Sequence, residues 1–293
     1  PRRVRPVKQT NPDNSRYFPM MKTILVLGGG GVKGMAHAGA WRAICEADVE
    51  VTEIVGTSIG GLVGALIAAG QDFDDLAKSA LALKKPDIVL LNRWSLLLNG
   101  IRQTSVFQSE PLHDYIASLL PVQRFDELSM PLQVNAVDLE NGDIHWFGAG
   151  GNMEISLVDA IYASCALPLF YPPAEIDGRY YVDGGVVDSL PVLRAADRGA
   201  DLIIAVDAGA GKARDALDTV NKGMIAIHHR VTEIMGYRRK RSVLDNWQGP
   251  KLIYVRPALH KYSTFDFGQT EFFLEEGYRA TQAALEGAGL VRT

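Results

Sequence analysis

The strongest constraint on the fold is a repeated order of segments near the start of the chain: a short apolar run, a turn with glycine, then a helical stretch. Ile24–Leu27 is a continuous apolar run that ends in glycines, which is typical of a fully buried strand. A helix is expected over Met35–Ala47, a second strand over Val51–Val55, and a second helix over Ile59–Ala69 with Gly70 as its stop signal. This order predicts a βαβ unit and a parallel sheet.

The rest of the chain continues the same α/β alternation. Further helices are expected over Asp72–Leu83, Ser156–Cys165, Ala216–Leu244 and Gln269–Gly287, and further strands over Leu132–Leu139, Ile144–Phe147, Tyr180–Val182, Leu202–Val206 and Leu252–Val255. Asn141-Gly142 is the expected turn within a strand pair. No internal repeat or Gly/Ser linker divides the chain, so we expect a single domain over residues 21–293.

The first 20 residues differ in composition from the remainder of the chain. They are rich in arginine and proline and poor in apolar residues, and the apolar run after Met21 stops at Gly28, too early for a signal peptide. We interpret residues 1–20 as a flexible tail, a linker or a cloning remnant, and Met21 as a plausible natural start. Ile54–Gln71 carries no charge, but its five glycines favour a buried core segment over a membrane span.

Composition narrows the class of protein. Hydrophobic residues make up 47% of the 293 residues and charged residues 22%, which is ordinary globular usage. The net charge of −4 gives no reason to expect nucleic-acid binding. Cys45 and Cys165 form no metal-binding pattern, so we expect no metal and no cofactor, and we interpret both as small buried residues in a reducing, cytoplasmic environment.

The first motif directly follows the first strand and reads Gly28-Gly29-Gly30-Gly31-Val32-Lys33-Gly34. Bare amide groups in such a turn can form a nest for a phosphate or a developing oxyanion, and the next helix adds its positive end. The spacing of Gly29, Gly31 and Gly34 also fits the dinucleotide-binding fingerprint, for which Glu50 or Glu53 could supply the acidic residue. Both interpretations stay open from this motif alone.

The second motif is Gly56-Thr57-Ser58-Ile59-Gly60, between the second strand and its helix. It matches the nucleophile elbow, in which a strained turn presents a serine hydroxyl and the glycines leave room for the bend. The alternative is an ordinary turn with Ser58 as a helix N-cap.

The third motif is Asp183-Gly184-Gly185, after the strand at Tyr180–Val182. An acidic residue at a strand end followed by glycines can face a cleft, although a solvated Asp-Gly turn has the same appearance.

The three motifs together, in this order and spacing, resemble the patatin-like phospholipase family. The resemblance runs from about Thr23 to Gly287, and further matching segments are Phe125-Asp126-Glu127-Leu128, Pro131-Leu132, Val137-Asp138-Leu139 and Ala163-Ser164-Cys165-Ala166-Leu167-Pro168. It implies a three-layer α/β/α sandwich with a mostly parallel central sheet.

The resemblance also implies a serine–aspartate dyad. Ser58 is then the nucleophile, Asp183 its base and later the acid, and the segment Gly29–Gly34 the oxyanion hole, with the amides of Gly30, Gly31 and Val32 as donors. Lys33 stands where many relatives carry arginine and lacks the bidentate fork, so no head-group role is carried over to it. Ile59 is bulkier than the alanine often found there, which narrows the expected pocket.

A histidine could still complete a triad in place of the dyad. The candidates are His37, His113, His145, His228, His229 and His260, and none stands in a recognisable catalytic motif. Each is therefore expected to have a structural or surface role.

The expected activity is hydrolysis of carboxylic esters of phospholipids, lysophospholipids or acylglycerols through an acyl-enzyme. The alternatives are acyl transfer by the same dyad, a non-catalytic regulatory protein and, more distantly, a dinucleotide-dependent dehydrogenase. Ile88–Leu91 and Trp94–Leu98 are candidates for an acyl-chain wall or for core packing. Arg238-Arg239-Lys240-Arg241 could meet anionic head groups in peripheral membrane contact or lie on a solvated helix face. The oligomeric state is left open.

Overall fold

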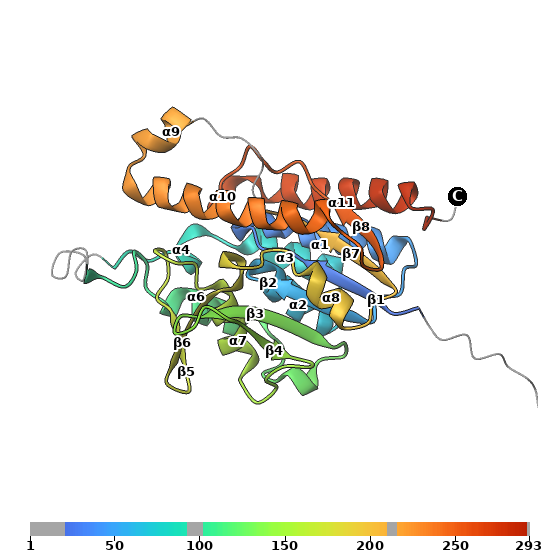
Figure 1. The fold of residues 1–293 in the computed structure, drawn as a ribbon, viewed down its shortest axis with the longest axis horizontal. Helices are drawn as coiled ribbons and strands as arrows, with labels where there is room; N and C mark the ends of the chain where they lie inside the picture. Colours follow the sequence, from blue (N-terminus) through green and yellow to red (C-terminus); the bar gives the residue numbers. More distant parts are fainter. Residues whose placement is uncertain (1–20, 93–101, 210–215, 292–293) are drawn as a thin grey trace, which may run out of the picture.

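The computed structural model describes residues 21–92, 102–209 and 216–291 (Figure 1). The strands are β1 Thr23–Leu27, β2 Glu53–Thr57, β3 Leu132–Asp138, β4 Ile144–Gly148, β5 Ala174–Ile176, β6 Arg179–Asp183, β7 Leu202–Val206 and β8 Lys251–Val255. The α-helices are α1 Ala36–Glu46, α2 Ile59–Ala68, α3 Phe73–Ala82, α4 Lys85–Ile88, α6 Glu110–Leu119, α7 Leu157–Cys165, α8 Val192–Asp197, α9 Ala216–Asn221, α10 Met224–Asp245 and α11 Thr270–Gly287. Short 3-10 helices occupy Gly31–Met35, Phe125–Glu127, Gly184–Val186 and Phe267–Gln269.

The eight strands form one sheet, in which β3, β2, β1, β7 and β8 are parallel neighbours. The antiparallel strands β4, β6 and β5 extend the sheet beyond β3. The parallel part follows from the apolar runs, because strands covered on both faces read as continuous hydrophobic segments.

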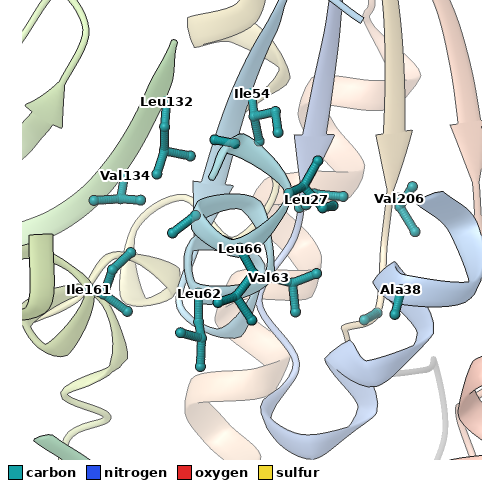
Figure 2. Close-up of a cluster of buried hydrophobic side chains, with 14 of the residues drawn as sticks. Leu27, Ala38, Ile54, Leu62, Val63, Leu66, Leu132, Val134, Ile161 and Val206 are labelled. Atoms are coloured by element: carbon teal, nitrogen blue, oxygen red, sulfur yellow. The ribbon is translucent and has the colours of Figure 1, made fainter. Parts of the chain in front are cut away.

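Helices cover both faces of the sheet, which confirms the predicted three-layer α/β/α sandwich. Leu25 and Leu27 of β1 point into a core shared with α1, α2, α3, α7 and α11. Ile24 and Val26 point to the other face, where α8 and the end of α10 cover them. Figure 2 shows the first core, with Leu62, Val63 and Leu66 of α2 packed against the strands.

The uncharged segment Ile54–Gln71 is a core segment, as predicted. It forms most of β2, the following turn and α2, whose residues from Gly60 to Ala68 are all buried. A side chain at Gly60 would overlap the carbonyl of Leu27, so glycine lets α2 lie directly on β1. Over the described ranges of the chain, no helix is long and apolar enough to cross a membrane.

Several boundaries correct the sequence prediction. The expected helix over Ala216–Leu244 is two helices, since Gly223 adopts a φ of 83° and ends α9. The second strand begins at Glu53, two residues later than expected, and Cys45 is exposed. Strand β5 and helices α4, α6 and α8 were not predicted. The candidate wall at Trp94–Leu98 lies outside the described residues.

Candidate active site

The three motifs meet at one edge of the sheet. The glycine-rich segment follows β1 and Ser58 follows β2, and the carboxyl ends of neighbouring parallel strands lie at the same edge. A Cβ atom added to Gly29 would lie 3.5 Å from the Cβ atom of Ser58, so the two turns are in contact. The edge thus joins the predicted nest to the predicted nucleophile.

Ser58 occupies a strained turn between β2 and α2. Its φ of 54° and ψ of −128° lie where non-glycine residues rarely occur, at a cost of about 1–3 kcal/mol. Its amide donates a 2.8 Å hydrogen bond to the hydroxyl of Ser164 on α7, which fixes the turn. Its side chain makes no N-cap hydrogen bond to α2. The conformation is that of a nucleophile elbow and not of an ordinary N-cap.

The strand register brings Asp183 to Ser58. Strand β4 occupies one edge of β3, so β2 and β6 must both pair along its other edge. Thr57 at the end of β2 pairs with Asn135, and Asp183 at the end of β6 pairs with the next residue, Ala136. The two strands therefore approach each other end to end, and Ser58 and Asp183 face each other across the junction.

The Asp183 carboxyl lies in a buried site with neutral partners. Burial raises its pKa from 3.8 to about 6, while hydrogen bonds from the Ser58 hydroxyl and the Gly185 amide oppose the rise. The Gly185 amide donates to Oδ1 at 2.7 Å. A carboxylate with a pKa near neutrality can accept a proton from a hydroxyl more readily than an ordinary one.

The glycine-rich segment leaves some of its amides without a partner. The amide of Gly29 donates to the Ser189 carbonyl and that of Val32 to the Thr264 carbonyl, each at 3.0 Å. Val32 was predicted to donate to an oxyanion, but here a residue from a distant loop occupies its amide. The amides of Gly30 and Gly31 donate to no group in the described part of the chain. The side chain of Lys33 is buried, so it does not extend from the surface toward head groups.

The six histidines are distributed over several parts of the structure. The ring of His37 is buried, its Nε2 is 2.8 Å from the Gly28 carbonyl, and burial lowers its pKa to about 4, so it is neutral and holds the glycine-rich segment. His113 contacts Asp159, and His145 packs on Phe147 and Tyr181. His229 lines the same pocket, where it packs on Phe170. His228 and His260 are exposed.

An apolar pocket is lined by Ser58 and Asp183. Gly29, Gly30 and Gly31 line it as well, and its apolar walls include Met35, Ile59, Leu62, Leu83, Ile88, Leu112, Leu167 and Phe265. Ile88 is thus part of the wall, as the sequence suggested, whereas Leu90 and Leu91 are exposed. Cys165 also reaches the pocket, and burial raises the pKa of its thiol, which keeps it neutral.

A second buried aspartate near the pocket escaped the sequence analysis. Asp207, just after β7, forms an ion pair with Lys240 of α10 at 2.6 Å and accepts a 2.7 Å hydrogen bond from Tyr254. The Lys240 ammonium holds the pKa of Asp207 below its usual value despite burial. Lys240 is therefore an internal anchor of α10, in contrast to its exposed neighbours Arg238, Arg239 and Arg241. The only sequence signal was an acidic residue after a strand.

The dinucleotide interpretation does not fit the geometry. Glu53 is the first residue of β2, at the opposite end of the strand from Ser58, and it pairs with Arg198 and Lys22. Glu50 precedes β2 at that same end. Neither can reach a nucleotide at the carboxyl edge of the sheet. Among the residues described by the structure, no group of three or more His, Cys, Asp or Glu side chains could hold a metal.

Comparison with known sequences identifies related proteins. A family model described as patatin-like phospholipase matches residues 25–196. An NTE family protein of Mycobacterium bovis is 34% identical over 76% of this chain and 60% of its own length. Lysophospholipase NTE1 of Saccharomyces cerevisiae is 30% identical over 90% of this chain and 16% of its own length. The chain thus spans less than two thirds of the length of each of these relatives.

Comparison with solved structures supports the fold. VipD from Legionella pneumophila aligns with a TM-score of 0.52 at 15% identity, over 92% of this chain and 67% of that one. Human GIVD cytosolic phospholipase A2 aligns with a TM-score of 0.50 at 12% identity, over 92% of this chain and 59% of that one. At such identities the likeness concerns the fold alone.

Proposed function

We propose that this chain, which belongs to the patatin-like phospholipase family, hydrolyses carboxylic esters of lipids through a dyad of Ser58 and Asp183. One observation carries the proposal: the buried carboxyl of Asp183 accepts a hydrogen bond from the hydroxyl of a serine in a strained elbow. The expected substrates are phospholipids, lysophospholipids or acylglycerols, since the pocket lined by Ser58 and Asp183 is mainly apolar.

The first half of the reaction forms an acyl-enzyme. Ionised Asp183 accepts the hydroxyl proton of Ser58 while Oγ attacks the ester carbonyl carbon. The tetrahedral intermediate collapses when the C–O bond to the leaving alcohol breaks and Asp183 returns the proton to that alcohol. In the second half, Asp183 accepts a proton from water, the resulting nucleophile attacks the acyl group, and Ser58 recovers its proton as the carboxylic acid leaves.

The amides of Gly30 and Gly31 are the proposed oxyanion donors. Both glycines line the same pocket as Ser58, and their amides donate no hydrogen bond within the described ranges. Gly31 adopts a φ of 60°, which favours glycine. The loss of one such donor typically costs about 3–4 kcal/mol of transition-state stabilisation. We propose that the Val32 amide contributes only if the loop carrying Thr264 moves away.

The test is hydrolysis of a p-nitrophenyl ester without added cofactor, followed by a lipid panel whose products are resolved by mass. Wild-type protein should release free fatty acid, and a fluorophosphonate probe should label Ser58. The Ser58→Ala variant should fold normally and lose both properties. Labelling at another residue, or near-normal turnover by the variant, would contradict the proposal. A new ester in place of free acid would instead indicate acyl transfer.

A further inference from the structure

Helix α10 has two distinct faces. One face lines the pocket through residues spaced three or four positions apart, namely His229, Thr232, Glu233, Gly236, Tyr237 and Lys240. Residues at this spacing share one side of a helix. None of the residues of α10 is fully buried, and Lys240 is its charged anchor to the sheet.

The opposite face of α10 is apolar and exposed. Its outward stripe consists of Met224, Ile227, Val231, Ile234 and Met235, whose exposed fractions lie between 41% and 77%. Leu217 and Val220 of the adjoining α9 are exposed as well. Figure 1 shows the two helices on one side of the molecule, with α9 projecting outward. A run of exposed apolar side chains of this kind marks an interaction site.

The same stripe continues into a cationic end. Arg238 and Arg241 follow Ile227, Val231 and Ile234 along the outward side, and Arg239 is exposed beside them. Arg241 pairs with Asp245 and Arg239 lies near enough to Asp188 to oppose the rise in the pKa of that carboxyl, whereas Arg238 forms no ion pair with any described residue. The helix carries five lysine and arginine residues against two carboxylates, although the whole chain has a net charge of −4. Lys240 is bound to Asp207 and Arg230 pairs with Glu233, so the exposed end of the helix carries Arg238, Arg239 and Arg241 against Asp245 and is net positive.

We propose that the outward surface of α9 and α10 docks on a bilayer that contains anionic phospholipid. The apolar stripe enters the boundary between head groups and acyl chains, and the arginine end contacts the phosphates, as in an interfacial amphipathic helix. Because the inward face of α10 is a wall of the pocket, docking places the pocket beside the lipid. This choice of partner rests on the proposed function, which makes membrane lipid the substrate.

The test is flotation with vesicles of phosphatidylcholine, with and without phosphatidylglycerol. One variant carries Ile227→Gln, Val231→Gln and Met235→Gln, and glutamine keeps a high helix propensity. The matched control carries Leu81→Gln, Leu139→Gln and Leu193→Gln, at leucines that are 50–53% exposed elsewhere on the surface. A third variant carries Arg238→Gln and Arg239→Gln. Turnover of a monomeric p-nitrophenyl ester is measured for each protein.

Wild-type protein should float with the anionic vesicles. The α10 apolar variant should bind them at least about 30-fold more weakly, and the arginine variant should bind them roughly 30-fold more weakly at low salt. The control should bind like wild type, and all four proteins should hydrolyse the monomeric ester equally.

Three results would overturn the docking proposal: unchanged vesicle binding by the α10 variants, an equal loss in the control, or a self-associated wild type that the apolar variant turns into a monomer. If the protein binds vesicles but does not hydrolyse the ester, the proposed function is contradicted and the docking proposal is not. If it hydrolyses the ester but does not bind vesicles, the docking proposal is contradicted and the proposed function is not.

Discussion

Two buried aspartates lie at the ends of two different strands of the sheet, and their environments differ. Asp183 is the last residue of the antiparallel strand β6 and accepts hydrogen bonds only from neutral donors, so burial raises its pKa to about 6. Asp207 follows the parallel strand β7 and meets the ammonium of Lys240, so its pKa falls below the usual value. Both carboxyls are almost fully buried, at 5% and 4% exposure. Because both carboxyls are buried, the difference between their pKa values comes from their partners: neutral donors at Asp183 and the Lys240 ammonium at Asp207.

The two carboxyl groups are suited to different roles. A carboxylate that titrates near neutrality beside a serine hydroxyl is suited to general base catalysis. A carboxylate locked in an ion pair is suited to holding α10 against the sheet, because removal of one partner leaves a buried charge uncompensated. Substitution of the two aspartates should therefore give opposite results for activity and stability.

The largest expected effect is on turnover in Asp183→Asn. The amide keeps the shape of the side chain but cannot accept the Ser58 proton, so kcat for ester hydrolysis should fall about a thousandfold with little change in KM. The Asp207→Asn variant is the matched control and should lose less than about tenfold in kcat, provided that it is assayed below its unfolding temperature. Similar losses in the two variants would break the distinction between them.

The next effect is on stability in Asp207→Asn. Lys240 would remain buried without a counter-charge, so the free energy of unfolding should drop by about 3–5 kcal/mol in urea denaturation. The double variant Asp207→Asn with Lys240→Met should recover most of the lost unfolding free energy, because it also removes the uncompensated ammonium of Lys240. If the single variant unfolds like wild type, the ion pair does not anchor α10.

Asp183→Asn should shift stability in the other direction. Asp183 binds its proton more tightly in the folded protein, with a pKa of about 6, than in the unfolded chain, with 3.8. Its ionisation therefore destabilises the fold increasingly as pH rises through this window, and fully above pH 6. The asparagine variant should gain up to about 3 kcal/mol in unfolding free energy at pH 8 and little at pH 4. If Asp183→Asn is no more stable than wild type at pH 8, ionisation of the buried Asp183 carboxyl does not destabilise the fold.

The smallest effect is expected at His229, which lines the pocket but lies outside the proposed dyad. His229→Gln should change kcat/KM for a p-nitrophenyl ester by less than about tenfold. A loss comparable with that of Asp183→Asn would indicate a histidine-mediated mechanism and would transfer the role of base away from Asp183.

Local patterns in the sequence predicted the elements around the dyad. Each of the apolar runs of β1 and β2 is followed within a few residues by its own glycine-containing turn, so both strand–turn–helix units could be predicted from local sequence. The pairing of Ser58 with Asp183 was inferred from resemblance, and its geometric cause is the register of β2 and β6 on β3.

Long-range contacts could not be predicted in this way. The occupation of the Val32 amide by Thr264 and the pairing of Asp207 with Lys240 join segments far apart in the chain. Lys240 stands among exposed arginines, so its sequence neighbourhood suggested a solvated face. The break before α10 depended on the positive φ of Gly223, which composition alone did not reveal.

The most direct test of the Ser58–Asp183 dyad is the pH dependence of kcat/KM for a neutral p-nitrophenyl ester, measured in wild type and in His229→Gln. If ionised Asp183 is the base, kcat/KM should fall tenfold per pH unit on the acid side with an apparent pKa near 6. The same limb should appear in the histidine variant. An apparent pKa near 4 for the acid-side fall of kcat/KM would contradict the assignment of Asp183 as the base. An apparent pKa near 6 that disappears in His229→Gln would contradict it as well.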